Sequence, residues 1–272
     1  ARGWRTPHPR TDMPPPLQFR DASEWEIGTP DLIVSSPSIT MKANSPDYWS
    51  PLGEAPTNLT EDRYVAAIEV KEVNDLQGRS GRQTIGGHYI FHHLVWSATG
   101  NALALADTWP VHEVGRNADF FDPDAGRLLK AGSRLVFSSA HLHAAGVETK
   151  ARVDIGFKFH PKGYQPKKRA ARTYPTATLD LDIRPMEANQ KIEASSTLTD
   201  NIRMVVFEPH MHAAGVRMCL EAIWMGAAQT LSCAGYNHNW VRVYSYADSA
   251  APLLPKGTIL RVTGYFDNTP NN

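Results

Sequence analysis

Short segments that alternate apolar with polar or small residues, separated by Gly and Pro, recur along most of this chain. Clear examples are YVAAIEV at 64–70, VDIGFKF at 153–159 and TILRVTGYF at 258–266. Successive side chains of a strand point to opposite faces, so this alternation is typical of half-buried strands. Further segments of this kind lie at 31–36, 88–96, 133–143, 177–183, 202–212, 218–225 and 240–246. Convincing amphipathic helices are scarce, and the pattern predicts an all-β fold of β-sandwich or jelly-roll type.

The chain has 272 residues, enough for two domains of ordinary size. The segment 160–178 has no apolar periodicity and holds three prolines and a basic cluster. We place a boundary there, with antiparallel β-sandwich domains expected at 31–165 and 176–272. The Pro-rich residues 1–30 predict an extended N-terminal arm. The basic stretch 162–172 is interpreted as a solvated linker, and docking of a protein partner there or on the arm is the alternative.

Charge and composition exclude several classes of partner. Lys plus Arg and Asp plus Glu are both 28, so no basic excess points to nucleic acid. No apolar run approaches the roughly 18 residues of a transmembrane segment. The first ten residues contain no apolar signal-peptide core, so Ala1 fits either a cleaved or a trimmed start. Cys219 and Cys233 fit a disulfide or two buried thiols.

One phrase occurs twice, as HLHAAGV at 141–147 and HMHAAGV at 210–216. The Gly of each copy suits a tight turn, but a turn alone does not require the two histidines. In a strand, residues i and i+2 share a face and lie about 6.6 Å apart, so two imidazoles can converge on one ion. The pairs His141/His143 and His210/His212 are therefore candidate metal ligands. Met211 faces away from its neighbours in the same geometry.

A third group is His92 with His93. Adjacent residues of a regular strand point to opposite faces, so both can bind one ion only where the strand twists, bulges or ends. The alternative is that one of them is a core histidine. His88 shares the face of His92 and is a weaker candidate. Ligands that are all imidazole suit copper or zinc better than magnesium or calcium.

Several phrases resemble the copper type II, ascorbate-dependent monooxygenases, the family of peptidylglycine alpha-hydroxylating and dopamine beta-monooxygenase, and especially its bacterial relatives. The similarity runs from about residue 12 to 272, and FHHLVW, then AHLH, then PHMH in that order is its most specific part. Its other phrases are MPPPLQF, WEIGTPDLIVSSP, LTEDRYVAAIEV, LKAGSRLVFSSAHLHAAG, IGFKF, FEPHMHAAG, YNHNW and LPKGTILRVTGYFDNTPNN.

The resemblance implies two antiparallel β-sandwich domains, each with one copper, that face each other across a solvent-filled cleft. It places the first, electron-supplying copper on His92, His93 and His141, with His143 the less certain member of its pair. It places the second, catalytic copper on His210 and His212. The family's third ligand there is a methionine beyond the last strand, a position that this sequence, ending at Asn272, does not include. A water or another side chain is the alternative third ligand.

The implied reaction inserts one atom of O₂ into a C–H bond of a small-molecule or peptide substrate and reduces the other atom to water. Ascorbate or another donor supplies two electrons, and we expect a periplasmic or secreted protein.

The alternative from a different class is a copper-binding or structural subunit of a larger assembly, with the same fold and no turnover. A double cupin, with a metal on His141, His143 and Glu148, is a third interpretation, but it leaves His92 and His93 unexplained.

Overall fold

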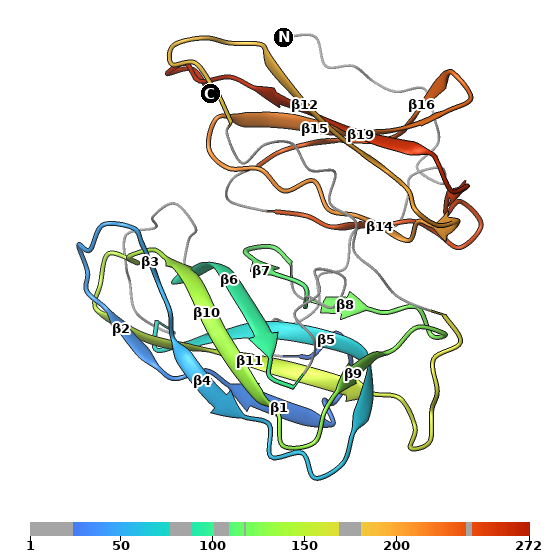
Figure 1. Ribbon diagram of the computed structural model, residues 1–272. Coiled ribbons are helices and arrows are strands. Elements are labelled where there is room, and N and C mark those ends of the chain that lie inside the picture. Colours follow the sequence, from blue (N-terminus) through green and yellow to red (C-terminus); the bar gives the residue numbers. More distant parts are fainter. Residues whose placement is uncertain (1–23, 77–88, 101–108, 117, 169–180, 238–240) are drawn as a thin grey trace, which may run out of the picture.

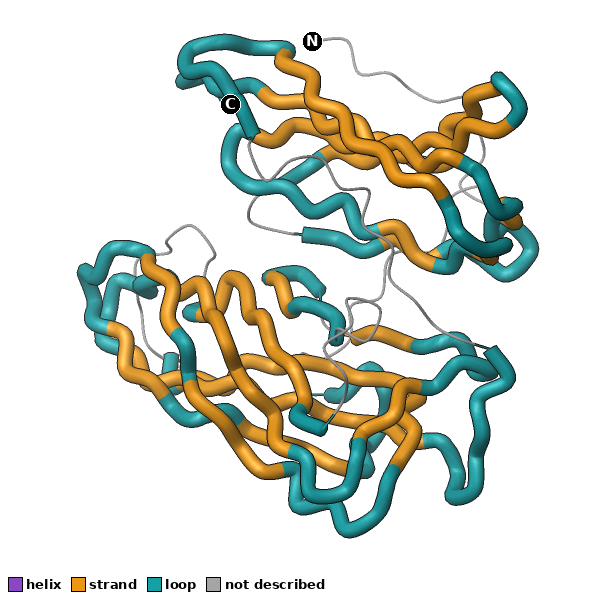
Figure 2. The backbone as a smooth tube through the Cα atoms, in the orientation of Figure 1, coloured by secondary structure: helices purple, strands orange, loops and turns teal. Residues whose placement is uncertain are grey.

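The computed structural model describes residues 24–76, 89–100, 109–116, 118–168, 181–237 and 241–272. These residues form strands, turns and loops, with no helix among them (Figure 2). No helix long and apolar enough to cross a membrane therefore occurs in this part of the chain. The predicted all-β fold is confirmed. The predictions for arm residues 1–23, for His88 and for the segment 169–180 lie outside the described residues.

We call residues 24–168 the N-terminal half and residues 181–272 the C-terminal half. The N-terminal half has two antiparallel sheets (Figure 1). The first contains β1 (Leu32–Ser35), β2 (Ile39–Met41), β5 (Arg63–Asn74), β8 (Ala118–Phe120), β9 (Arg127–Leu129) and β11 (Thr149–Phe159). The second contains β3 (Tyr48–Ser50), β4 (Gly53–Pro56), β6 (Phe91–Ala98), β7 (His112–Glu113) and β10 (Arg134–Leu142).

One hydrophobic core joins these two sheets. Phe157 and Ile68 come from the first sheet, and Phe137 and Leu94 from the second, and each is at most 1% exposed. Burying a large apolar side chain stabilises a fold by about 1.5–3 kcal/mol. The alternation along β10 supplies this core, whereas Phe91 to Leu94 at the start of β6 are all buried. The buried start of β6 thus includes two adjacent histidines, His92 and His93.

A half-buried carboxylate fixes the start of β6. Glu72 of β5 accepts hydrogen bonds from the backbone N–H groups of Ile90 and Phe91, each at 2.9 Å. Burial raises the pKa of Glu72, while Asn74 and the two backbone donors act in the opposite direction. The backbone leading into His92 is therefore held by a side chain of the other sheet.

The C-terminal half is built on a four-stranded sheet of order β12-β19-β15-β16, and a second hydrophobic cluster packs on it. Its strands are β12 (Gln190–Thr197), β15 (Gly215–Trp224), β16 (Ala227–Gly235) and β19 (Ile259–Phe266). Two short pairs complete the half, β13 (Ile202–Arg203) with β18 (Leu253–Leu254) and β14 (Val206–Phe207) with β17 (Tyr244–Ser245). Cys219 and Cys233 face each other across β15 and β16 and form a disulfide.

The prediction of a single strand over residues 202–212 is wrong. Strand pairing stops at Phe207, and residues 208–212 are irregular. Pro209 cannot donate a backbone hydrogen bond, which removes it from a regular sheet ladder. The described residues of the expected strand 177–183, which are 181–183, also lie outside any strand. His210 and His212 are consequently presented by a loop.

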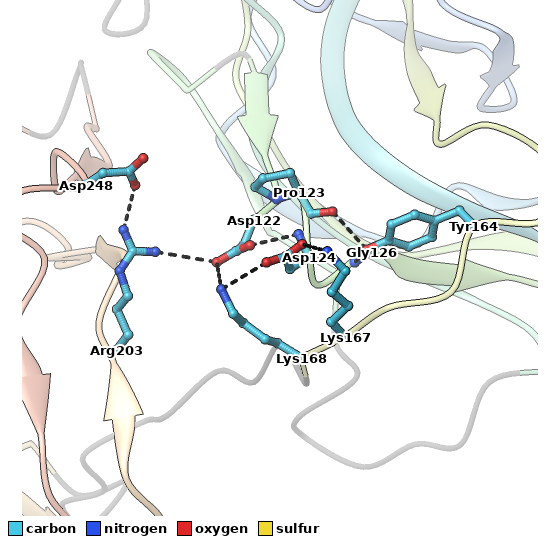
Figure 3. A network of polar contacts seen from close by, with 9 residues as sticks. All are labelled: Asp122, Pro123, Asp124, Gly126, Tyr164, Lys167, Lys168, Arg203 and Asp248. Carbon is cyan, nitrogen blue, oxygen red and sulfur yellow. Dashed lines mark hydrogen bonds and ion pairs between the residues drawn. The ribbon is translucent and has the colours of Figure 1, made fainter.

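Ion pairs link the basic segment to the body of the protein and the two halves to each other (Figure 3). Lys167 and Lys168 both lie 3.3 Å from carboxylate oxygens of Asp124. Arg203 of β13 lies 3.5 Å from Asp122, and so reaches across to the N-terminal half. The described lysines of the segment 162–172 thus have partners within the chain, and docking of another protein there stays a prediction.

Candidate metal centre

Three groups of side chains bring nitrogen or oxygen donors within 4.8 Å of one another. The first group is His92, His93 and His141, the second is His93, His210 and His212, and the third is Asp47, His141 and His143. The six described histidines singled out from the sequence all occur in these groups. Glu148, which the cupin interpretation requires, belongs to none of the groups among the described residues.

The first group lies where β6 and β10 pair, and its geometry depends on a bulge. His93 pairs with His141, but the next pair is Phe91 with Leu142, so His92 is an extra residue on β6. The expectation that the strand must twist, bulge or end for His92 and His93 to converge is confirmed. A bulge re-aims a side chain because two residues on one strand oppose one on the other.

Three imidazole nitrogens meet at this bulge. Nδ1 of His93 lies 2.8 Å from Nδ1 of His92 and 3.3 Å from Nδ1 of His141. His92 and His93 are buried, and His141 is half-buried. The indole of Trp49, on β3, stacks on the His141 ring at a centroid distance of 4.7 Å. Three converging nitrogen donors, mostly shielded from water, fit a transition-metal ion.

The electrostatics of the first group favour neutral imidazoles. Burial, followed by the neighbouring histidines His92, His210, His212 and His141, lowers the pKa of His93 to about 2. A neutral imidazole has a lone pair free for a metal, whereas a protonated one does not. Nε2 of His93 is also buried and makes no hydrogen bond to the described residues. Both observations fit a metal ligand better than a histidine satisfied by the core.

His143 has different surroundings. It is 4% exposed, and its Nδ1 lies 3.2 Å from Oδ2 of Asp47. Its backbone N–H donates to the carbonyl of Ile90, which extends the pairing of β10 with the chain before β6. The structure therefore brings the His143 ring next to those of His141 and His92, at centroid distances of 4.5 and 4.7 Å, while its donor atoms group with Asp47 and His141.

The second histidine pair projects from the loop before β15. Nε2 of His210 lies 3.3 Å from Nε2 of His212, while Met211 between them is buried. Met211 thus faces away from the pair, as expected. Gly215 is required here by close packing, since a Cβ on it would lie 2.8 Å from Cβ of Met211 and 2.9 Å from the carbonyl oxygen of His212.

The C-terminal pair lies beside the first group. The ring centroids of His93 and His210 are 5.1 Å apart, and those of His93 and His212 are 5.5 Å apart. The resemblance implies two metal sites separated by a solvent-filled cleft. In this structure the two histidine groups are in contact and share His93.

Specific contacts between the halves account for this proximity. Arg116, after β7, pairs with Asp119 at 2.5 Å and with Glu208 of the C-terminal half at 2.8 Å. The backbone N–H of Val241 donates to the carbonyl of Val114 at 2.9 Å. Figure 1 shows β7 and β14 on the facing sides of the two halves. Burial alone would lower the pKa of Arg116, but the charges of Asp119 and Glu208 outweigh it and raise the pKa above its usual value. The guanidinium therefore stays charged.

A carboxylate of the N-terminal half also contacts the second pair directly. Oε1 of Glu113, a side chain only 1% exposed, touches Nδ1 of His210. Sequence reasoning missed Glu113, Arg116 and Glu208. Glu208 lies two residues before His210, which is a local signal, but Glu113 and Arg116 are about a hundred positions away in sequence and carry none.

A pocket of about 200 Å³ adjoins the second pair. It is lined by Pro209, Gly235, Tyr236, Asn237, Val241, Arg242 and Tyr244. Burial, and then the charge of Glu113, raises the pKa of Tyr236 to about 12, so the phenol keeps its proton. The lining includes two tyrosines, an asparagine and an arginine, residue types that can bind a polar group of a small molecule.

Comparison of the chain with models of known protein families and with curated proteins gives no match.

Proposed function

We propose that this chain is a copper-dependent, monooxygenase-like protein that hydroxylates a C–H bond with O₂ and two electrons from ascorbate or another donor. The observation that carries the proposal is the convergence of the histidines of FHHLVW, AHLH and PHMH at one place. The donors of the first two groups are imidazoles alone, a set that suits copper or zinc. Copper would supply the one-electron redox chemistry and the binding of O₂ that such a hydroxylation needs.

Each group of residues has a task in this proposal. His92, His93 and His141 hold the ion that supplies the second electron. His210 and His212 hold the ion at which substrate reacts, and the adjoining pocket binds the polar end of that substrate. The β6 bulge, Trp49 and the contacts of Arg116 fix the positions of the imidazoles, which lowers the reorganisation required during the reaction.

We further propose a periplasmic or secreted location. The disulfide between Cys219 and Cys233 supports it, because disulfides persist mainly in oxidising compartments.

A second candidate function is a copper-binding or structural subunit without turnover. The observation that favours it is the direct contact between the two histidine groups. Ions held there would serve to fix the halves to each other.

Oxygen consumption tests the enzyme proposal against this alternative. Copper-loaded protein, freed of excess metal, is given ascorbate in an oxygen electrode with catalase present, against a panel of small metabolites and amidated or free peptides. We expect substrate-dependent O₂ uptake and one ¹⁸O atom from ¹⁸O₂ in the product.

His210→Ala should abolish that uptake, whereas His160→Gln, outside all three groups, should preserve it. Uptake that no substrate stimulates, and that is equal in His210→Ala and the wild type, would favour the structural subunit.

A further inference from the structure

His93 stands in two metal-binding groups at once. One group joins it to His92 and His141 of its own half, and the other joins it to His210 and His212 of the C-terminal half. Sequence reasoning assigns His93 to the first group alone. The proposed function likewise gives the second ion only two ligands from this chain.

The two ring nitrogens of His93 have different surroundings. Nδ1 is the nitrogen that lies close to both His92 and His141. Nε2 is buried and makes no hydrogen bond to the described residues. Since the nitrogens point to different sides of an imidazole ring, Nε2 is the one left for a ligand outside the first group. A buried polar atom without a partner is costly, and a metal ion removes that cost.

His210 is oriented for the same ion. Its Nδ1 contacts the buried carboxylate of Glu113, while its Nε2 lies 3.3 Å from Nε2 of His212. Histidines that bind metals commonly direct their other ring nitrogen to a carboxylate, which fixes the tautomer and the ring orientation. Here that carboxylate comes from the N-terminal half of the chain.

We propose that a transition-metal ion bound by Nε2 of His210 and His212 takes its third imidazole from His93, so that one ion joins the two halves. Glu113 is the positioning residue of this site. Three imidazoles leave a fourth position open, the arrangement of many catalytic metal sites. The inference goes beyond the proposed function, because it requires neither copper in particular nor turnover.

The two halves are already arranged for such a site. The pair between Arg116 and Glu208 and the hydrogen bond between Val241 and Val114 hold the halves together beside it. Ligands held at short range bind an ion with a higher effective concentration than ligands on separate bodies. By linkage, an ion that binds only the docked arrangement stabilises that arrangement.

Zinc binding in two variants tests the ligand assignment, because zinc has no redox chemistry. His92→Ala with His141→Ala breaks the first and third groups and leaves His93, His210 and His212 intact. Adding His93→Gln to this double variant breaks the second group as well. By titration calorimetry we expect the former to bind one zinc ion and the latter to bind it at least tenfold more weakly. Equal affinities, or no zinc binding by the former, would overturn the proposal.

Hydrogen exchange in the otherwise unaltered protein tests the bridge and does not depend on how the buried variants fold. Zinc should slow exchange of the Val241 amide, which donates across the two halves. His212 is exposed, so His212→Ala should fold normally and lose this effect. Unchanged exchange at Val241 on zinc addition to the wild type would refute a bridging ion, whatever the outcome of the oxygen-consumption assay.

Glu113→Gln tests the positioning role. It should weaken zinc binding in the double variant by roughly 10–100-fold. It should also change the Cu(II) electron paramagnetic resonance spectrum of that site, which a purely structural residue would not do. Glu54→Gln, an exposed glutamate paired with Arg134 in the same half, is the matched control and should change neither. An identical spectrum and affinity for Glu113→Gln would remove Glu113 from the site.

Discussion

At the scale of residues, the two copies of His-x-His-Ala-Ala-Gly-Val differ in backbone conformation and in the role of their glycine. In the first copy Gly146 has a positive φ of 78°, the conformation that favours glycine. In the second copy Ala214 takes the positive φ, 72°, and Gly215 is needed instead for its close approach to Met211. The sequence correctly indicates that the glycines serve the fold, but identical letters do not show that the two turns differ.

A titratable residue outside the three groups gives a prediction about pH. His112 of β7 is only 7% exposed. Burial, and then the charge of Arg116, lowers its pKa from 6.5 to about 4. Between these values the unfolded chain binds more protons than the folded one, so the free energy of unfolding rises with pH.

We therefore expect metal-free protein to lose stability as pH falls from about 6.5 to about 4, with His112 contributing up to roughly 1.4 kcal/mol per pH unit. His112→Phe should remove this part of the slope and leave the part due to other groups. Urea unfolding followed by fluorescence at pH 4.5, 5.5 and 6.5 measures it. Parallel slopes for the variant and the wild type would show that His112 titrates normally in the fold.

At the scale of elements, the strands that carry the clearest alternation were predictable, and β5, β10, β11 and β19 overlap the expected segments. The bulge in β6 could be deduced from His92 and His93 because adjacent ligands cannot converge in a regular strand. The loop before β15 could not be deduced from the sequence. Its side chains still alternate, as in a strand, between buried Met211 and the more exposed histidines on either side. There Pro209 and the contacts with the other half decide the backbone.

The pairing of β15 with β16 gives a second prediction. The disulfide closes a loop between residues 14 apart in the sequence. In the chain-entropy account, such a bond stabilises the fold by about 3 kcal/mol. Cys219→Ser with Cys233→Ser should lower the urea midpoint of the C-terminal half in metal-free protein. Dithiothreitol should lower the midpoint of the wild type similarly and leave the double variant unchanged. Insensitivity of the wild type to complete reduction would contradict this.

At the scale of the whole molecule, the two histidine groups lie side by side because two halves with separate cores dock through contacts such as Arg116 with Glu208 and Glu113 with His210. Sequence reasoning could assign histidines to groups by spacing within a segment. It could not place His93 beside His210, because contacts between halves depend on tertiary packing and leave no periodic pattern. The direct contact of the two groups is the main difference from the arrangement that the resemblance implies.

The most direct test of the account is the metal content of purified protein after loading with copper and zinc in competition, measured by elemental mass spectrometry. The account predicts two coppers per chain in the wild type. It predicts one in His92→Ala, which should lose the first ion, and one in His210→Ala, which should lose the second. A wild type that takes up no copper, or variants that both keep the full metal content, would contradict it and leave the histidine groups as parts of the fold.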